Sequence, residues 1–330
     1  MLSFLYIEGM HHKSNPKNLN KKRILAFGEV LWDLLPSGKI LGGAPFNFAF
    51  RMHSLGYDIR LVSRVGNDEL GEEVLERMAH LKMNPSLIQR DDSYPTGMVH
   101  VTLTGAQPDF QIAENVAYDH IVLSNNLIQA VSTTDCFYFG TLIQRSNKSS
   151  TTLRRLVESS TEKLFFLDLN LRKSCFSRET VDYSLNHATI LKLNDEEVDA
   201  ISQMLSISKA SIHNFCQQIM SRYALDVCLV TMGDKGVFGI SKENAVYSPG
   251  YRVAVVDTIG AGDAFAAGFL HKWLEAQDLK SACNLGNALG ALIAMQQGGT
   301  QPITITEIQD MLDSDRLRIV EPVLAPYIEM

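Results

Sequence analysis

The residues best suited to chemistry lie in one short run of the C-terminal half, Asp257-Thr258-Ile259-Gly260-Ala261-Gly262-Asp263. The two glycines let neighbouring backbone N–H groups converge. The apolar residues from Ala264 onward predict a helix, whose first turn adds unpaired N–H groups and a positive dipole end. Gly260, Ala261 and Gly262 are therefore predicted to form an anion hole for a phosphoryl group.

Asp263 stands where that helix is predicted to begin, and two roles fit it. Its ordinary role would be to cap the helix N-terminus. A cap alone does not require two glycines before it and a further acid, Asp257, earlier in the same run. A carboxylate beside a phosphoryl group is suited to take the proton of an attacking hydroxyl, so we interpret Asp263 as a general base.

Other glycine-rich nucleotide motifs do not fit this chain. In the Rossmann pattern G-x-G-x-x-G, the third glycine would fall on Phe265. The P-loop pattern G-x-x-x-x-G-K-[ST] does not occur, because Gly38-Lys39 is followed by Ile40. The protein-kinase elements H-R-D and D-F-G are absent as well. The common nucleotide-binding motifs are thus excluded.

The run DTIGAGDAF at 257–265 resembles the C-terminal signature of the ribokinase-type (PfkB) carbohydrate kinases. The N-terminal half agrees through Gly28-Glu29 followed by Asp33, through GGAPFN at 42–47 and through RVGNDELG at 64–71. The resemblance spans about residues 21–303, and GGAP, PTGMV, FGTLIQR and DLNLR are most similar to the bacterial fructokinases. It implies a ribokinase-like α/β fold and phosphate transfer from ATP to a primary hydroxyl.

The resemblance assigns sugar contacts to the N-terminal half. Asp33, Gly43 and Asn47 match positions that bind sugar hydroxyls. Gly42 supports the tight turn beside them. A carboxylate and an amide suit this role because they hydrogen-bond adjacent hydroxyls, while glycine lets a sugar ring approach the backbone. The alternative for Asn47 is an ordinary cap at a helix start.

A second polar group, Asp168, Asn170 and Arg172, follows a predicted strand, at the edge where open α/β sheets bind ligands. Alternation along an extended chain would send all three side chains to one side. The resemblance implies that they border the sugar and the transferred phosphate. A surface ion pair between Asp168 and Arg172 is the alternative. Arg172 would also suit an acidic sugar, since guanidinium pairs well with carboxylate.

The resemblance places the nucleotide and its metal on later segments. Asn194 and Glu197 match positions that hold Mg²⁺ through water, as suits an ion that keeps its water shell. Without the family they are typical of the acidic start of a helix. The implied ATP-binding positions are Lys192, Asn194, Thr231, Gly233, Gly236, Gly260, Gly262 and Asn287. A K⁺ ion, bound beside the anion hole in many relatives, would have as neighbours Asp257, Ile259, Ala294 and Gly299.

Short apolar strands that alternate with amphipathic helices must position these groups. Strands are predicted at Arg23–Phe27, Ile59–Val65, Cys136–Phe139, Leu164–Leu169, Ala188–Leu193, Val227–Thr231 and Val253–Val256. Helices are predicted at Pro45–Leu55, after Asn67-Asp68, at Ala264–Leu274 and at Leu279–Gln297, and we expect one after each strand from Cys136–Phe139 onward. This alternation predicts a doubly wound, mostly parallel sheet flanked by helices.

One segment breaks this rhythm. Residues Thr96–Thr104 alternate with period two, turn through 105–109 and resume at Phe110–Ile112, which predicts a β-hairpin with one covered face. We expect a small β lid with strands drawn from about 33–42 and 96–112. An extension at the edge of the main sheet fits the pattern equally well. The chain is then a single kinase domain at 21–330 behind a loose extension at 1–20.

Composition limits the partners of this 330-residue chain. Its 30 Lys and Arg against 37 Asp and Glu give a net charge of -7, which argues against nucleic-acid and anionic-membrane binding. The five scattered cysteines include no C-x-x-C pair, so we expect reduced thiols in a cytoplasmic protein. No segment approaches the roughly 18 apolar residues of a transmembrane helix.

These features predict an ATP- and Mg²⁺-dependent kinase that converts fructose to fructose 6-phosphate. A kinase for ribose, 2-keto-3-deoxygluconate or a nucleoside is the alternative. A catalytically idle sugar-binding regulator is a third reading, which the intact Asp263, its glycines and Asn194 with Glu197 disfavour. Lid edges of relatives often pair across a dimer, so a homodimer through the lid is a further expectation.

Overall fold

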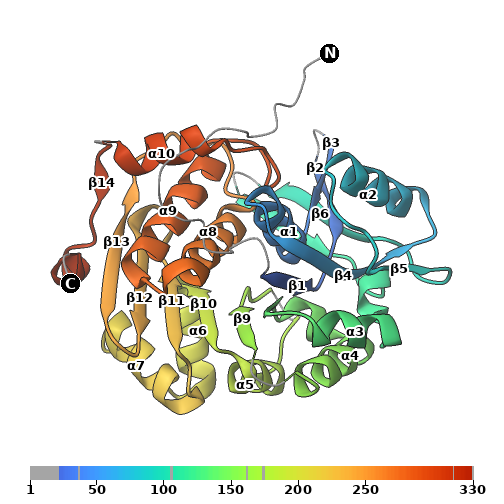
Figure 1. Ribbon diagram of the computed structural model, residues 1–330, viewed down its shortest axis with the longest axis horizontal. Coiled ribbons are helices and arrows are strands. Elements are labelled where there is room, and N and C mark those ends of the chain that lie inside the picture. The colour runs from blue at the N-terminus through green and yellow to red at the C-terminus, as the bar shows by residue number, and fades with distance from the viewer. Residues whose placement is uncertain are drawn as a thin grey trace.

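A ten-stranded sheet forms the centre of the molecule, and a separate four-stranded sheet lies to one side. The structure is a computed structural model that describes residues 22–35, 38–104, 107–160, 163–172, 175–314 and 316–328. The extension expected at 1–20 lies outside the described residues. Figure 1 shows helices on both faces of the central sheet. Within the described residues, no helix combines the length and the apolar character needed to cross a membrane.

The parallel part of the central sheet brings the ends of several strands to one edge. Its strands, in spatial order, are β5 (Ile88–Asp91), β4 (Asp58–Gly66), β1 (Arg23–Phe27), β8 (Cys136–Phe139), β9 (Leu164–Asp168), β10 (Ile190–Asn194) and β11 (Val227–Thr231). Every neighbouring pair among them is parallel. The prediction of a mostly parallel α/β sheet is confirmed.

The sheet ends in three antiparallel strands, which the sequence pattern did not predict. These are β12 (Gly236–Ser241), β13 (Ala245–Tyr251) and β14 (Arg318–Ile319). A helix was expected after β11, but the short 3-10 turn η4 (Gly233–Lys235) leads straight into β12, because Gly233 and Gly236 take positive φ angles. The strand predicted at Val253–Val256 is also wrong, since β13 ends earlier and Val255 and Val256 are exposed.

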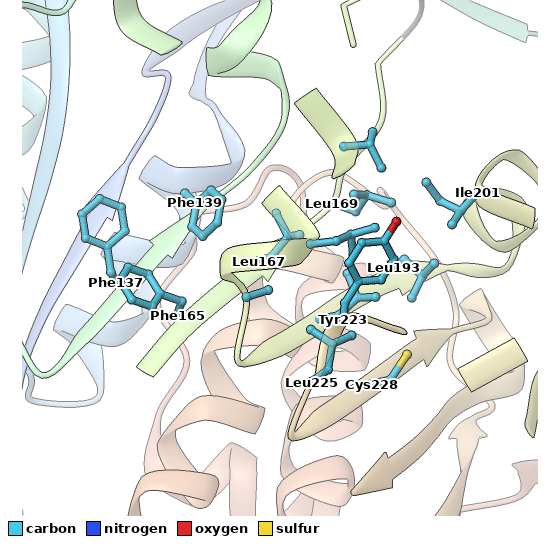
Figure 2. Packing of buried hydrophobic residues seen from close by; sticks show 14 of the residues in the cluster. Phe137, Phe139, Phe165, Leu167, Leu169, Leu193, Ile201, Tyr223, Leu225 and Cys228 are labelled. Carbon is cyan, nitrogen blue, oxygen red and sulfur yellow. The ribbon is translucent and has the colours of Figure 1, made fainter. Parts of the chain in front are cut away.

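Two layers of helices bury the two faces of the sheet. One layer contains α1 (Ala44–Ser54), α2 (Glu69–His80), α8 (Ala261–Ala276) and α9 (Leu279–Ala294), with α10 (Ile305–Asp313) packed on α9. The other contains α3 (Asn125–Ser132), α4 (Asn147–Glu158), α5 (Arg178–His187), α6 (Asp195–Leu205) and α7 (Ile212–Tyr223). Alternate strand residues enter the two cores. Phe137 and Phe139 meet Phe165 and Leu167 on the second face, as Figure 2 shows, while Tyr138 enters the first.

The small sheet has the strand order β3-β2-β6-β7 and is separate from the main sheet, so the alternative of an edge extension is wrong. Its members are β2 (Leu31–Leu35), β3 (Gly38–Gly42), β6 (Gly97–Thr104) and β7 (Gln107–Ile112). Strand β7 begins opposite Thr104, so the turn predicted at 105–109 was too long. Pro108 is tolerated because β7 is an edge strand.

The small sheet is anchored on α2. The indole Nε1 of Trp32 donates to the carbonyl of Leu70 at 3.0 Å. The ammonium of Lys39 pairs with Glu73 at 2.6 Å and lies over the Trp32 ring. These contacts place β2 and β3 beside the N-terminus of α1, which β3 precedes directly in the chain. Movement of this sheet as a lid stays a prediction.

The contact between α8 and α9 gives a test of how α8 is held in place. A Cβ on Gly286 of α9 would lie 2.8 Å from the Phe265 ring and 3.0 Å from its carbonyl oxygen. We expect Gly286→Ala to lower the free energy of unfolding by about 1–3 kcal/mol, because overpacking forces these helices apart. Urea unfolding measures it, with Lys280→Ala on the exposed face of α9 as the control. Equal stability of the two variants would contradict this packing.

Candidate active site

Asn47 and Asp263 meet across the N-termini of α1 and α8. The amide Nδ2 of Asn47 donates to Oδ2 of Asp263 at 2.8 Å. Gly43 and Gly260, both at positive φ, are the N-cap residues of the two helices, and neither helix has a side-chain cap. Asn47 and Asp263 therefore lie inside the first turns. The alternative roles of both residues as caps are wrong, and their side chains are free for a ligand and for each other.

The surroundings of Asp263 raise its affinity for a proton. Burial raises the pKa of Asp263 to about 6, and the charge of Asp168 adds to that rise. The hydrogen bond from Asn47 and the charges of Lys192 and Arg172 act in the opposite direction. A carboxyl group with this pKa is ionised at neutral pH and can still accept a proton, which is the property a general base requires.

A buried ion pair lies beside Asp263. The ammonium of Lys192 contacts both carboxylate oxygens of Asp168, at 2.9 and 3.0 Å, and the hydroxyl of Tyr138 donates to Oδ2 at 3.0 Å. Burial alone would lower the pKa of Lys192, but Asp168 and the neighbouring acids raise it, so the side chain stays charged. A Cβ on Gly262 would lie 3.5 Å from this ammonium. Lys192 thus brings positive charge to the predicted anion hole.

The DLNLR run does not continue as the extended chain on which the predicted alternation depends. Strand β9 ends at Asp168, and Asn170 takes a left-handed backbone conformation with φ of 45°. Asp168 is buried on Lys192, so the alternative of a surface ion pair with Arg172 is wrong. Arg172 is exposed, yet its charge lowers the pKa of Glu29, Asp33 and Asp263. Among the described residues, it is the cation whose charge acts on all three acids.

Glu29 is a site residue to which sequence reasoning gave no role. It is only 4% exposed, and its carboxylate accepts hydrogen bonds from its own N–H and from the N–H of Ala44, the first residue of α1. Burial raises its pKa to about 7. A small cavity of about 10 Å³ has polar lining residues, namely Glu29, Tyr138, Thr141, Asp168 and Asn170. The only signal was its place after the first strand, in the Gly28-Glu29 motif.

Asp33 and the two glycines of the GGAP run lie close together, as predicted for a sugar site. Asp33, on β2, is half-buried, and burial raises its pKa to about 6. A Cβ on Gly42 would lie 2.6 Å from Oδ2 of Asp33, and one on Gly43 would lie 2.6 Å from the carbonyl oxygen of Glu29. Backbone atoms and a positive φ require glycine at position 43, while a side chain at position 42 would displace the Asp33 carboxylate. Their binding of sugar stays a prediction.

Asn194 and Glu197 form a capping box at the start of α6, as the family-independent interpretation expected. The Asn194 amide oxygen accepts from the Glu197 N–H at 2.7 Å, while the two Glu197 oxygens accept from the N–H groups of Leu171 and Asn194 at 2.6 and 2.8 Å. Across the described residues, no group of three or more His, Cys, Asp or Glu could hold a metal directly. Each oxygen keeps a lone pair, so these residues fit Mg²⁺ only through its water.

The residues expected around K⁺ come together behind the anion hole. The two carboxylate oxygens of Asp257 accept from the N–H groups of Ile259 and Gly298, each at 3.0 Å. The Ala294 carbonyl accepts from the N–H groups of residues 256 and 257, at 2.8 and 3.3 Å. Both lone pairs of that carbonyl are therefore used, which argues against Ala294 as a K⁺ ligand in this conformation. The K⁺ site, including Gly299, stays a prediction.

The predicted ATP-binding positions also reach this edge of the sheet. Thr231, at the end of β11, is the register partner of Asn194 at the end of β10, and Gly233 and Gly236 bound the turn that follows. Asn287 of α9 donates through Nδ2 to the carbonyl and hydroxyl of Ser248, at 2.8 and 2.9 Å. Asn287 thus ties α9 to β13, and its contact with adenine stays a prediction.

A mostly parallel α/β sheet, a small β-sheet beside it and a buried acid in a glycine-flanked helix N-terminus define a class of small-molecule phosphotransferases. The sequence profile of the pfkB family carbohydrate kinases matches residues 27–306. The chain belongs to this family.

Individual proteins agree with this membership over nearly the whole chain. An uncharacterized sugar kinase of Pyrococcus horikoshii is 30% identical over 301 residues, which cover 85% of this chain and 93% of that protein. Fructokinase-1 of Oryza sativa is 25% identical and covers 88% of this chain and 98% of its own. The structure of a Xylella fastidiosa fructokinase with bound ATP has a TM-score of 0.78 at 23% identity and covers 88% of this chain and 98% of its own, a similarity of fold.

The buried acid Glu29 predicts a stability that falls with pH. Its pKa rises from 4.5 to about 7 on folding, so the folded state increasingly disfavours ionisation between these values. The loss amounts to about 3 kcal/mol once the pH passes 7. Glu29→Gln keeps an acceptor for the Ala44 N–H but cannot ionise. We expect it to stabilise the protein at pH 8 relative to wild type by more than it does at pH 5.

Urea unfolding of both proteins at the two pH values measures this difference. Glu76→Gln, at an exposed position of α2, is the matched control and should give the same difference from wild type at each pH. A Glu29→Gln effect that is identical at pH 5 and pH 8 would show that the carboxyl group does not ionise differently in the folded state.

Proposed function

We propose that the protein transfers the γ-phosphoryl group of ATP to the 6-hydroxyl of fructose. The observation that carries this proposal is the hydrogen bond between Asn47 and Asp263 at the N-terminus of α8. It joins a residue suited to bind sugar hydroxyls with an acid suited to remove a proton. Both lie beside the backbone N–H groups at Gly260, Ala261 and Gly262, which suit a phosphoryl group.

The reaction follows from this arrangement. Because Asn47 occupies Oδ2 of Asp263, Oδ1 is left to accept the proton of the sugar hydroxyl. The hydroxyl oxygen then forms a bond to the γ-phosphorus as the bond from that phosphorus to the β-phosphate oxygen breaks. The proton remains on Asp263, whose pKa of about 6 lets it return to solvent at neutral pH. ADP leaves with the bonding electrons.

The chain offsets the negative charge of the transferred phosphoryl group in two ways. The N–H groups of the α8 N-terminus would donate to the oxygens of the phosphoryl group, and Lys192 supplies a buried positive charge beside Gly262. Mg²⁺, when bound with ATP, supplies further neutralisation of the phosphates. Asn194 and Glu197 would orient its water shell. Thr231, Gly233 and Gly236 are proposed to bind the remaining phosphates, and Asn287 borders the adenine.

The balance of charge favours a neutral sugar. Among the described residues, Arg172 is the cation whose charge acts on all three acids, Glu29, Asp33 and Asp263, while Lys192 is paired with Asp168. The carboxylate of an acidic sugar would be repelled by these acids, whereas the hydroxyls of fructose can donate to them. The fructokinase activity named for the Oryza sativa relative supports the same choice.

The small β-sheet is proposed to close over the sugar. Its anchoring on α2 through Trp32 and Lys39 keeps β2, which carries Asp33, at the site. Closure would exclude water and so limit hydrolysis of ATP. Within the described residues, its edge strands β3 and β7 each pair on one side only, which supports a homodimer formed through this sheet.

Replacing the base tests the mechanism. Asp263→Asn keeps the shape of the side chain and removes the proton acceptor. We expect kcat to fall by at least about 10²-fold with little change in ATP binding. The wild-type kcat/KM should decline as pH falls through about 6, because Asp263 must be ionised. Asp92→Asn, at an exposed position, serves as the control; turnover near wild type in Asp263→Asn would refute the assignment.

The substrate is tested by following ADP release with a set of acceptors at equal concentration. We expect fructose to give the highest kcat/KM among fructose, ribose, 2-keto-3-deoxygluconate and adenosine, and phosphorus NMR should locate the phosphate on its 6-oxygen. A higher value for the acidic sugar would contradict the charge argument. No turnover with any of them would favour a sugar-binding regulator.

A further inference from the structure

Arg51 is a buried cation that the proposed mechanism does not use. It lies four residues after Asn47 and therefore on the same side of α1. Its side chain is almost fully covered, since the residue is only 2% exposed. Nη2 donates to the carbonyl of Gln301 at 2.8 Å, while Nε has no hydrogen-bond partner among the residues that the structure describes. Burial lowers its pKa to about 10, and within the described residues no acid offsets this effect.

An unpaired buried charge is expensive to keep, because it loses its hydration without gaining a counter-ion. Folding alone therefore gives no reason for arginine at this position, where an apolar side chain of similar length would fill the space. In the described part of the chain, the Arg51 guanidinium lies over the Phe50 ring, 5.3 Å from its centroid, and the bond to Gln301 is its one side-chain hydrogen bond. The role of Arg51 should therefore be to hold the segment that contains Gln301.

That segment, residues 297–301, passes directly behind the active site. The N–H of Gly298 donates to Oδ2 of Asp257, at the start of the anion-hole run. A Cβ on Gly299 would lie 2.8 Å from Nδ2 of Asn47, and a Cβ on Gly260 would lie 2.4 Å from the Cα of Gly299. The backbone of Gly299 is thus wedged between the Asn47 amide and the anion hole.

The two ends of the 297–301 segment have different anchors. Asp257 holds it at Gly298, and Arg51 holds it at Gln301. Gly299 lies between these anchors and packs against the amide of Asn47, whose Nδ2 also donates to Asp263. If the Arg51 anchor were lost, Gly299 could move away and the Asn47 amide could turn from the carboxylate.

We propose that Arg51 is a positioning residue, which keeps Gly299 beneath Asn47 and thereby holds the Asn47 amide on the carboxylate of Asp263. This inference rests on the roles that the proposed function gives to Asn47 and Asp263. Arg51 touches neither substrate. It acts on the orientation of the base and on its affinity for a proton, since the hydrogen bond from Asn47 favours the ionised form of Asp263.

The experiment compares Arg51→Met with Arg51→Lys, Asn47→Ala and a control, Arg155→Met, at an exposed position of α4. For each variant, kcat and KM for sugar and for ATP are measured from pH 5 to 8, together with urea unfolding. We expect Arg51→Met to lower kcat about tenfold and to move the acid limb of kcat/KM to higher pH, because Asp263 loses its hydrogen bond. The KM for ATP should change less than twofold.

The stabilities and pH profiles of the variants should also differ from those expected if Arg51 served folding alone. Arg51→Met should be at least as stable as wild type, because a buried lone charge has been removed. Arg51→Lys, which retains a donor for Gln301, should recover part of kcat and of the acid limb. The pH shifts of Arg51→Met and Asn47→Ala should not add in the double variant, because both act through one hydrogen bond.

Two results would overturn the proposal. One is a wild-type kcat and acid limb in Arg51→Met. The other is a loss of stability with both KM values raised and the acid limb unmoved, which would mark Arg51 as a structural anchor only. If Arg51→Met does not fold, Arg51→Lys takes its place. An acid limb of kcat/KM at the wild-type pH in Arg51→Lys would then contradict the proposal. Failure of the proposed function is recognised separately, by undiminished turnover of Asp263→Asn.

Discussion

The arrangement of the active site depends on the buried ion pair between Asp168 and Lys192. The two residues are register partners on adjacent parallel strands, so the sheet itself places their charges together. Neither charge could be buried alone at acceptable cost, and removing one partner would leave the other uncompensated. The paired ammonium also faces Gly262 at the start of α8. The ion pair of Asp168 and Lys192 therefore links the central sheet to the acidic side chains of the predicted sugar site and to the predicted anion hole.

Around this ion pair, several acidic side chains lie where water has little access to them. Glu29, Asp33 and Asp263 all have pKa values raised chiefly by burial, which is a loss of stability accepted for function. Three opposing contacts limit the rise at Asp263: the Asn47 hydrogen bond and the charges of Lys192 and Arg172. The result is a base whose proton affinity lies between those of a solvated carboxylate and of a fully desolvated one.

The sequence predicted what depends on local pattern and missed what depends on register and on three-dimensional neighbours. Strands such as Cys136–Phe139 and Val227–Thr231 were found with correct bounds, because residues buried on both faces give continuous apolar runs. The antiparallel strands after β11 were missed, since two glycines replace the expected helix with a turn. The ion pair of Asp168 with Lys192 was missed, because its two residues lie on different strands, and the left-handed Asn170 ends the alternation that was expected along the DLNLR run. The sequence pattern does not indicate that Glu29 and Arg51 are buried.

The pKa of Glu29 has a thermodynamic consequence for every ligand of this site. With a value near 7, the carboxyl group is about half protonated in neutral solution. A ligand that contacts Glu29, or that changes the charge around it, must therefore release protons to the buffer or take them up. The heat of binding measured by calorimetry will then include the ionisation enthalpy of the buffer, and its slope against that enthalpy counts the protons exchanged.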